Sequence, residues 1–404
     1  MSERSQPAMP GLFVTIAILL LSGMTVMANA TIAPALPALR VHFGDVPGIE
    51  TLLGLLMTLP SAAIMLTAGL IGWLSDKVDR QKLLIASGLL YVIGGTSGLW
   101  VDSLAAMLAG RAILGVGVAG TMVLSATWAA DLWQGDARAR FLGQQGAAVA
   151  AGGVAVIILG GALASLNWRG AFATYLLIVP VTIIAWTALI PHARHRTAQS
   201  TNRSPGAQIR GSFPWRAFAF VGTLGFLFMT AFYIIPTRLP FLLGNVGVQS
   251  PFMLGAVTAL VTLAALPGAL TFGRMRRRMS AMTIFALSWG VMGLGMLILS
   301  VAPTAPVMSL GTAIVGLGMG PAIPNYTSHL MSVVPAAARG RASGLLTTAF
   351  FGGQFASPLV SGLFVPTLGL AGTFQVLALF QLALALILAC AAFVANKRAT
   401  GKMP

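Results

Sequence analysis

Apolar runs of about 20 residues recur along the whole chain and restrict what it can fold into. Each run is long enough to cross a bilayer as an α-helix, where every backbone N–H and C=O group must be hydrogen-bonded within the protein. Charged residues make up only 8% of the 404 residues, against about a quarter in a soluble protein. The predicted fold class is therefore an all-α integral membrane protein.

Twelve transmembrane helices account for these runs. A polar stretch from His192 to Trp215 separates the sixth from the seventh and has the composition of a flexible linker. We therefore expect an N-terminal six-helix bundle over 1–190, a cytoplasmic linker over 191–216 and a C-terminal six-helix bundle over 217–404. The predicted helices are 12–38, 51–74, 83–100, 105–129, 142–164, 171–190, 217–241, 251–272, 282–300, 305–327, 343–364 and 371–394.

The first apolar run also imitates a signal peptide. Arg4 precedes it, and Ala28-Asn29-Ala30 has the small residues of a cleavage site. The run nevertheless extends from Leu12 to about Pro34, which is long enough to span a membrane. We therefore expect it to remain in the protein as the first helix.

Basic residues indicate the orientation of the helices. With a cytoplasmic N-terminus, twenty of the 24 lysines and arginines fall on the cytoplasmic side, as the positive-inside rule requires. Both termini are then cytoplasmic. The net charge of +16 is accounted for in this way, and we expect no nucleic-acid partner, because such proteins gather basic residues on one solvated face.

The two halves of the chain repeat each other. A shift of 201 residues places Arg111-Ala-Ile-Leu-Gly115-Val-Gly117 on Thr312-Ala-Ile-Val-Gly316-Leu-Gly318, and it also places Arg138 on Arg339. Parallel repeats of this kind are typical of transporters whose halves rock around a central site.

A charged turn joins the second and third predicted helices and reads Gly72-Trp-Leu-Ser-Asp76-Lys-Val-Asp79-Arg80-Gln-Lys82. It resembles the loop signature of the major facilitator superfamily, except that Asp79 stands where the family has a second glycine. The resemblance implies twelve helices in two pseudo-symmetric bundles. It also implies a cytoplasmic gate of charge pairs, to which we assign Gly72, Asp76, Arg80, Asp131 and Arg138. The alternative is a solvated loop whose charges only set the topology.

Arg111 lies inside predicted helix 105–129, on the order of 9 Å from its outer end at about 1.5 Å per residue. Charged residues at such a depth usually face a cavity and have a function. Arg111-Ala-Ile-Leu-Gly115-Val-Gly117 also resembles the Arg-x-x-x-Gly-x-Gly motif of drug:proton antiporters, which implies a role for Arg111 in proton coupling. The alternative is an arginine that snorkels toward the membrane surface, or that binds backbone carbonyls and holds helices together.

Predicted helix 142–164 bears on the direction of transport. Exporters of the family carry a Gly-Pro-x-x-Gly-Gly element here, whereas this chain has the pair Gly160-Gly161 without the proline. The antiporter motif is therefore incomplete, and close helix packing explains the glycines equally well.

The eight acidic residues all map to loops or helix ends, so no carboxylate is expected in mid-membrane. With arginines inside helices 105–129 and 217–241, the cavity should be neutral to positive and its cargo neutral, zwitterionic or anionic. Each polar residue within the spans could line this cavity or form an interhelical hydrogen bond instead. The predicted cavity residues are Asn29, Trp128, Tyr233, Arg238, Asn325, Tyr326 and Gln354.

A transporter explains the helices, the repeat and the loop motif together. The resemblance is to twelve-helix drug and metabolite:proton antiporters, so we expect proton-coupled efflux of small organic molecules by alternating access. The expected setting is a monomer in the lipid bilayer of a bacterial inner membrane. Uptake symport or facilitated transport of a small organic anion is the alternative, and a non-transporting receptor is a third reading.

No enzyme, cofactor or metal site is expected. The sequence has no catalytic cluster of paired carboxylates or of His with Asp, and no phosphate-binding loop. Histidines and acids do not fall at metal-ligand spacings.

Overall fold

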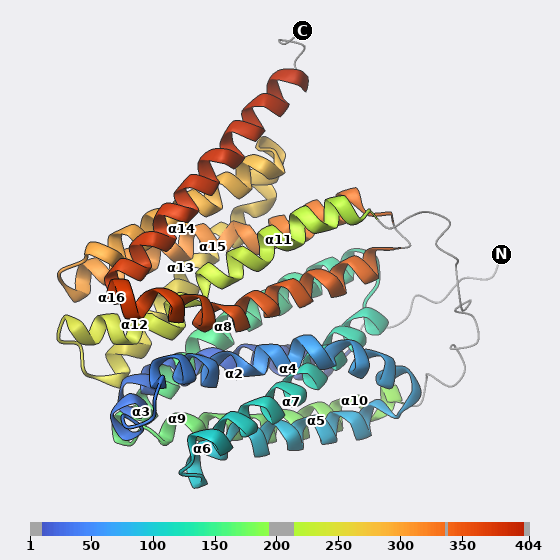
Figure 1. The fold of residues 1–404 in the computed structure, drawn as a ribbon. Coiled ribbons are helices and arrows are strands. Elements are labelled where there is room, and N and C mark those ends of the chain that lie inside the picture. Colours follow the sequence, from blue (N-terminus) through green and yellow to red (C-terminus); the bar gives the residue numbers. More distant parts are fainter. Residues whose placement is uncertain (1–9, 194–213, 336–337, 400–404) are drawn as a thin grey trace.

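The computed structural model describes residues 10–193, 214–335 and 338–399 (Figure 1). These residues contain eleven helical segments that are long and apolar enough to cross a membrane. The last segment, α16 (Arg339–Ala399), contains Gly369 at φ 67° and ψ −177°, a backbone conformation that interrupts a helix and favours glycine. Two spans therefore lie within α16, on either side of Gly369, as predicted, and the twelve-helix all-α fold is confirmed.

The first half of the chain forms helices α1 to α10. Their bounds are α1 (Leu12–Gly23), η1 (Met24–Val26), α2 (Met27–Ala30), η2 (Ala33–Ala35), α3 (Leu36–His42), α4 (Ile49–Lys77), α5 (Arg80–Gly95), α6 (Ser97–Trp100), α7 (Leu104–Leu132), α8 (Gly135–Leu166), α9 (Gly170–Ala173), η3 (Thr174–Leu177) and α10 (Ile178–Ala193).

The second half forms helices α11 to α16, with fewer short segments than the first half. They are α11 (Trp215–Phe232), α12 (Ile234–Asn245), α13 (Pro251–Arg278), α14 (Ala281–Val301), α15 (Ala305–Val333) and α16.

The first predicted helix, 12–38, is not continuous. It breaks into α1, η1, α2, η2 and α3. Pro34 and Pro37 cannot donate the backbone hydrogen bonds of a regular helix, which accounts for the interruption between α2 and α3, whereas η1 lies before both prolines. Other helices run beyond their predicted ends: α8 begins at Gly135 rather than at 142. The prediction followed apolar residues, whereas a helix can continue into the polar region beyond the hydrocarbon core.

Two buried apolar cores organise these helices. One is built mainly from the first half of the chain, with Phe241 of α12 added, and the other from residues of the second half. In Figure 1 the blue-to-green helices form the lower group, and most of the yellow-to-red helices form the upper one. The predicted boundaries 1–190, 191–216 and 217–404 remain a prediction, and residues 194–213 of the linker lie outside the described residues.

The two groups meet along two helix pairs, α8 with α13 and α4 with α16. Glycines allow close approach in both: Gly161 of α8 packs on Pro251 and Gly255 of α13, and Gly54 of α4 packs on Pro358 of α16. These contacts lie toward the end of the molecule that carries α3 and α12, named here the α3–α12 end (Figure 1). The opposite end is the one where α10 ends and α11 begins.

Candidate functional site

Four polar side chains meet between the two groups of helices. Asn29 Nδ2 lies 2.6 Å from Ser61 Oγ, 3.3 Å from the Tyr233 hydroxyl and 3.0 Å from Gln354 Oε1. Ser61 also donates to Gln354 Oε1 at 2.7 Å. Asn29 and Ser61 come from the first half of the chain, and Tyr233 and Gln354 come from the second. We name these four residues the central cluster.

Irregular backbone places two members of the cluster. Asn29 lies in the short α2, within the interrupted first span, and Tyr233 is the junction between α11 and α12. Ser61 follows Pro60 in the middle of α4, and Gln354 lies beside Gly352 and Gly353 in α16. Interrupted helices are common where transporters bind their substrates.

The central cluster carries no charge. Each of its polar atoms named above has a hydrogen-bond partner. Asn29 is 4% exposed, and its Oδ1 atom has no hydrogen-bond partner among the described residues. The cluster therefore offers amide and hydroxyl groups to a ligand, together with at least one buried acceptor that is unused in this structure.

An ion-pair network lies beyond the cluster, toward the α3–α12 end. Arg238 is five residues after Tyr233, or about 7.5 Å along the helix axis. Its Nε donates to Ser361 Oγ at 3.0 Å, and its Nη1 donates to the backbone oxygen of Glu50 at 3.1 Å. The Glu50 carboxylate lies 3.9 Å from Arg238 Nη1 and 2.8 Å from Arg40 Nη2. Because Glu50 is in α4 and Arg238 in α12, this network joins the two halves.

Arg111 is buried in the core of the first half. Pro60 has no N–H, so the carbonyl of Leu56, four residues earlier in α4, lacks its helical partner. Arg111 Nε donates to this oxygen at 2.9 Å, and its guanidinium lies 5.0 Å from the Tyr175 ring centroid and 5.4 Å from that of Phe172. These contacts resemble the helix-holding alternative that the sequence left open. The part of Arg111 in proton coupling remains a prediction.

The opposite end of the molecule carries a further ion pair. Arg80, at the start of α5, donates to Asp131 near the end of α7 at 2.7 Å. The Arg80 side chain is 8% exposed and that of Asp131 is 34% exposed. Asp76 lies in the last turn of α4, whereas Arg138 is exposed in the first turn of α8. The structure thus brings together two of the five predicted gate residues in a pair.

Two residues of the charged turn have local explanations. Asp79 accepts a hydrogen bond from the backbone N–H of Gln81 at 2.7 Å and is the N-cap of α5. The aspartate that replaces the family's glycine therefore stabilises the start of a helix. At Gly72 an added Cβ would meet no atom within 4 Å, so packing does not require glycine there.

The other predicted cavity residues lie within the cores. Trp128 is 3% exposed in the core of the first half. Asn325 Nδ2 donates to the Ala281 carbonyl at 3.0 Å, and the Tyr326 hydroxyl donates to the Leu224 carbonyl at 3.2 Å. The structure therefore brings together Asn29, Tyr233 and Gln354 of the seven predicted residues. Ser61 was missed, although the Pro60-Ser61 pair in the middle of an apolar run was a usable signal.

A second charged group lies in the loops of the α3–α12 end. Asp102 Oδ1 contacts His42 Nε2 at 2.8 Å and Arg169 Nη2 at 2.7 Å. The hydrogen bond from His42 and the nearby Arg169 charge together lower the pKa of Asp102. All three residues come from the first half of the chain, so the group ties α3 to the loops after α6 and before α9.

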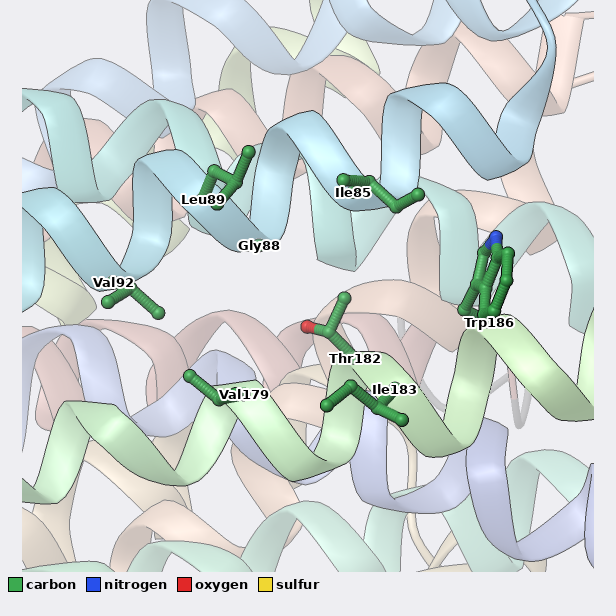
Figure 2. Close-up of a pocket in the computed structure, with 8 residues that line it drawn as sticks. All are labelled: Ile85, Gly88, Leu89, Val92, Val179, Thr182, Ile183 and Trp186. Carbon is green, nitrogen blue, oxygen red and sulfur yellow. The ribbon is translucent and has the colours of Figure 1, made fainter.

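Figure 2 shows an apolar groove of about 280 Å³ between α5 and α10. Several of its lining side chains, such as Leu89 and Ile183, are more than half exposed on the outer surface of the bundle. A groove with this lining suits hydrocarbon and is not a path for a polar solute. It is lined by Ile85, Gly88, Leu89, Val92, Val179, Thr182, Ile183 and Trp186.

Two groups of membrane-length helices with a polar cluster between them define a multi-pass membrane transporter of the parallel-repeat class. Residues 18–358 match the family model of the Major Facilitator Superfamily, and residues 221–402 match it again. The chain belongs to the Major Facilitator Superfamily, and the resemblance seen in loop 72–82 is confirmed.

Curated relatives match over part of the chain. A segment of 149 residues is 29% identical to the bacillibactin exporter of Bacillus subtilis (strain 168), covering 35% of this chain and 36% of that protein. A segment of 140 residues is 34% identical to the minor myo-inositol transporter IolF of the same organism. The match covers 33% of this chain and 32% of that protein. The chain thus spans about a third of the length of these relatives.

A solved structure shares the fold over nearly the whole chain. The inward open conformation of the xylose transporter XylE from E. coli superposes with a TM-score of 0.72 at 16% identity. The superposition covers 93% of this chain and 94% of that one. At this identity the likeness concerns the fold alone.

Proposed function

We propose that this protein exports small organic molecules in exchange for protons by alternating access. The observation that carries the proposal is the central cluster, in which polar side chains from membrane-length helices of both halves meet. A solute held there contacts both halves, so a rocking movement can expose it first to one side of the membrane and then to the other.

The contacts between the halves support one state of such a cycle. Two sets of side-chain hydrogen bonds join the halves between described residues. One set is in the central cluster, and the other is the Arg238–Glu50 contact, which lies toward the α3–α12 end. The count of basic residues assigns the α3–α12 end to the outside. We therefore assign this structure to a state that is closed to the outside.

The remaining assignments follow the sequence and the contacts together. The substrate cavity is proposed to include Asn29, Tyr233 and Gln354, with Ser61 added. We propose that the Arg80–Asp131 pair belongs to a cytoplasmic gate together with Gly72, Asp76 and Arg138. Both partners of the pair lie in the first half and the pair is formed in this structure, so it fixes the start of α5 to the end of α7 and does not itself join the halves.

Coupling and direction rest on similarity. The Arg111 motif supports a proton-coupled antiporter, and the partial match to an exporter supports efflux. The alternative is uptake symport or facilitated transport of a small organic anion, and the partial match to a myo-inositol transporter shows that relatives other than exporters are also similar to this chain. We place the protein in a bacterial inner membrane as a monomer with both termini cytoplasmic.

The test is proton movement in proteoliposomes that contain an internal pH dye and are given an imposed proton gradient. Cationic, neutral and anionic compounds are added in turn, and a proton flux triggered by one of them supports coupled transport. Arg111→Ala should abolish the proton flux, whereas Arg169→Ala, an arginine of the outer loops, should retain it. Because Arg111 is buried, Arg111→Lys is tested too, and correct folding is checked by thermal unfolding.

Solute movement without proton flux would contradict proton coupling. Movement of no compound in a folded protein would contradict transport itself.

A further inference from the structure

We infer that the central cluster recognises an uncharged solute bearing hydroxyl or amide groups. The inference rests on the proposed function and narrows it, because the sequence left neutral, zwitterionic and anionic cargo open. It follows from two observations: which polar atoms of the cluster have hydrogen-bond partners, and which groups the nearest arginines bind.

Arg111 and Arg238, the two arginines that favoured an anionic cargo in the sequence, bind groups outside the central cluster. The Arg111 guanidinium lies in the core of the first half against Tyr175 and donates to Leu56. Arg238 is engaged by Glu50 and Ser361 toward the α3–α12 end. An anion at the cluster would lose its water without gaining a positively charged partner there, and burying an unpaired charge is costly.

Asn29 leaves an acceptor for a ligand. Its Nδ2 atom faces three oxygen atoms, from Ser61, Tyr233 and Gln354, while its Oδ1 atom has no partner among the described residues. Whichever way the amide is turned, one of its two polar atoms is left unpaired. In the orientation seen, the unpaired atom accepts a hydrogen bond from a donor on the solute.

Tyr233 supplies the complementary group. Its hydroxyl oxygen accepts from Asn29, which leaves the phenolic proton to be donated. A hydroxyl or an amide on the solute can donate to Asn29 and accept from Tyr233 at once. An ammonium group has no lone pair for Tyr233, and a carboxylate has no proton for Asn29. The two charged classes therefore each leave one buried polar group unsatisfied, which is unfavourable.

Gln354→Glu tests this inference with little change in shape. Among the described residues, the hydrogen bonds of Gln354 are made by its Oε1 atom, which accepts from Asn29 and Ser61. A glutamate keeps both acceptor positions while adding a negative charge. The matched control is Gln145→Glu. Gln145 is half-buried, and its Nε2 donates to Ser22 at 2.8 Å, a hydrogen bond within the first half and outside the central cluster.

The probes are mannitol and chloramphenicol as uncharged solutes, tetraphenylphosphonium as a cation and benzoate as an anion, each measured as flux into or out of proteoliposomes. We expect the wild type and Gln145→Glu to move an uncharged probe. We expect Gln354→Glu to slow this flux at least tenfold and to gain flux of tetraphenylphosphonium.

Three outcomes would overturn the inference. The wild type could move benzoate or tetraphenylphosphonium but neither uncharged probe, which contradicts the inference and leaves transport intact. Gln354→Glu could keep the wild-type selectivity, which removes the cluster from recognition. If no probe moves in a folded protein, the proposed function itself fails, and the inference fails with it.

Discussion

Replacing Arg238 should open the α3–α12 end of the protein. Arg238 is 1% exposed, and its one hydrogen bond to a described residue of the other half runs from Nη1 to the backbone oxygen of Glu50 at 3.1 Å. A hydrogen bond from a charged group contributes about 1.5–3 kcal/mol. The Nε bond to Ser361 stays within the second half and does not hold the halves together.

Arg238→Met removes the contact between halves but keeps an apolar side chain of similar length. We expect it to destabilise the closed end by about 2 kcal/mol, which corresponds to a shift of about 30-fold in the ratio of closed to open molecules. Glu50→Gln should have a smaller effect, below about 1 kcal/mol, because the backbone oxygen of residue 50 remains and only a partly exposed ion pair is lost.

The assay uses a cysteine at position 51. Thr51 is half-buried and packs against Gly362 across the two halves, so a reagent in water should reach Thr51→Cys faster when that end opens. Cys390, the single cysteine in the sequence, is first replaced by serine. The rate of modification by a membrane-impermeant maleimide should rise about 30-fold in Arg238→Met. Ser361→Ala, which changes a partner within the same half, should raise the rate far less.

Equal rates in Arg238→Met and its parent would refute the reasoning. A larger effect in Glu50→Gln than in Arg238→Met would also refute it, because the carboxylate and not the backbone oxygen would then carry the contact.

Further predictions concern the opposite end, the close helix contacts and pH. Asp131→Asn should lower the free energy of unfolding by about 1–3 kcal/mol, because the buried Arg80 guanidinium loses a charged partner. Thermal unfolding measures this change, and an unchanged midpoint temperature would contradict the prediction. Gly161→Leu should impair closure and reduce solute flux, because even a Cβ there would lie 2.8 Å from the Pro251 carbonyl oxygen; unchanged flux would show that α8 and α13 need not approach so closely. The pKa of Asp102 is lower in the folded protein than its ordinary value of 3.8. The ionised Asp102 carboxylate therefore stabilises the fold fully above pH 3.8, and this stabilisation is lost as the pH falls through the lower pKa of the folded state. Asp102→Asn should remove this part of the pH dependence when unfolding is followed between about pH 2 and 6, and an unchanged pH profile would contradict the assignment.

The number and position of the transmembrane helices could be predicted from the sequence because the bilayer imposes a length on each apolar run. The break in the last long helix was also predictable, since the two predicted spans leave Gly369 between them. Interruptions in the first span were not predicted. The interruption between α2 and α3 depends on where Pro34 and Pro37 remove backbone donors within an apolar run, and hydropathy alone does not register that loss.

The candidate site was predictable only in part. Asn29, Tyr233 and Gln354 stood out as polar residues in apolar spans, but so did Asn325 and Tyr326, which bond to backbone carbonyls inside the second half. Both roles need the same residue types, so only packing between distant segments separates them.

Arg111 illustrates the same limit. Its depth in the membrane marks it as unusual in the sequence, yet its hydrogen bond is explained by Pro60, which is about fifty residues away in the chain and frees the carbonyl of Leu56.

Alternating access is the central claim, and distances measured at both ends of the same molecule test it most directly. Spin labels at Val41 and Asn245 report on the α3–α12 end, and labels at Val78 and Arg278 report on the opposite end; all four positions are exposed. The two distances are measured in proteoliposomes for the Cys390→Ser parent and for Arg238→Met. We predict that Arg238→Met lengthens the first distance and shortens the second. Lengthening of the first distance with no change in the second would contradict a rocking movement around the central cluster.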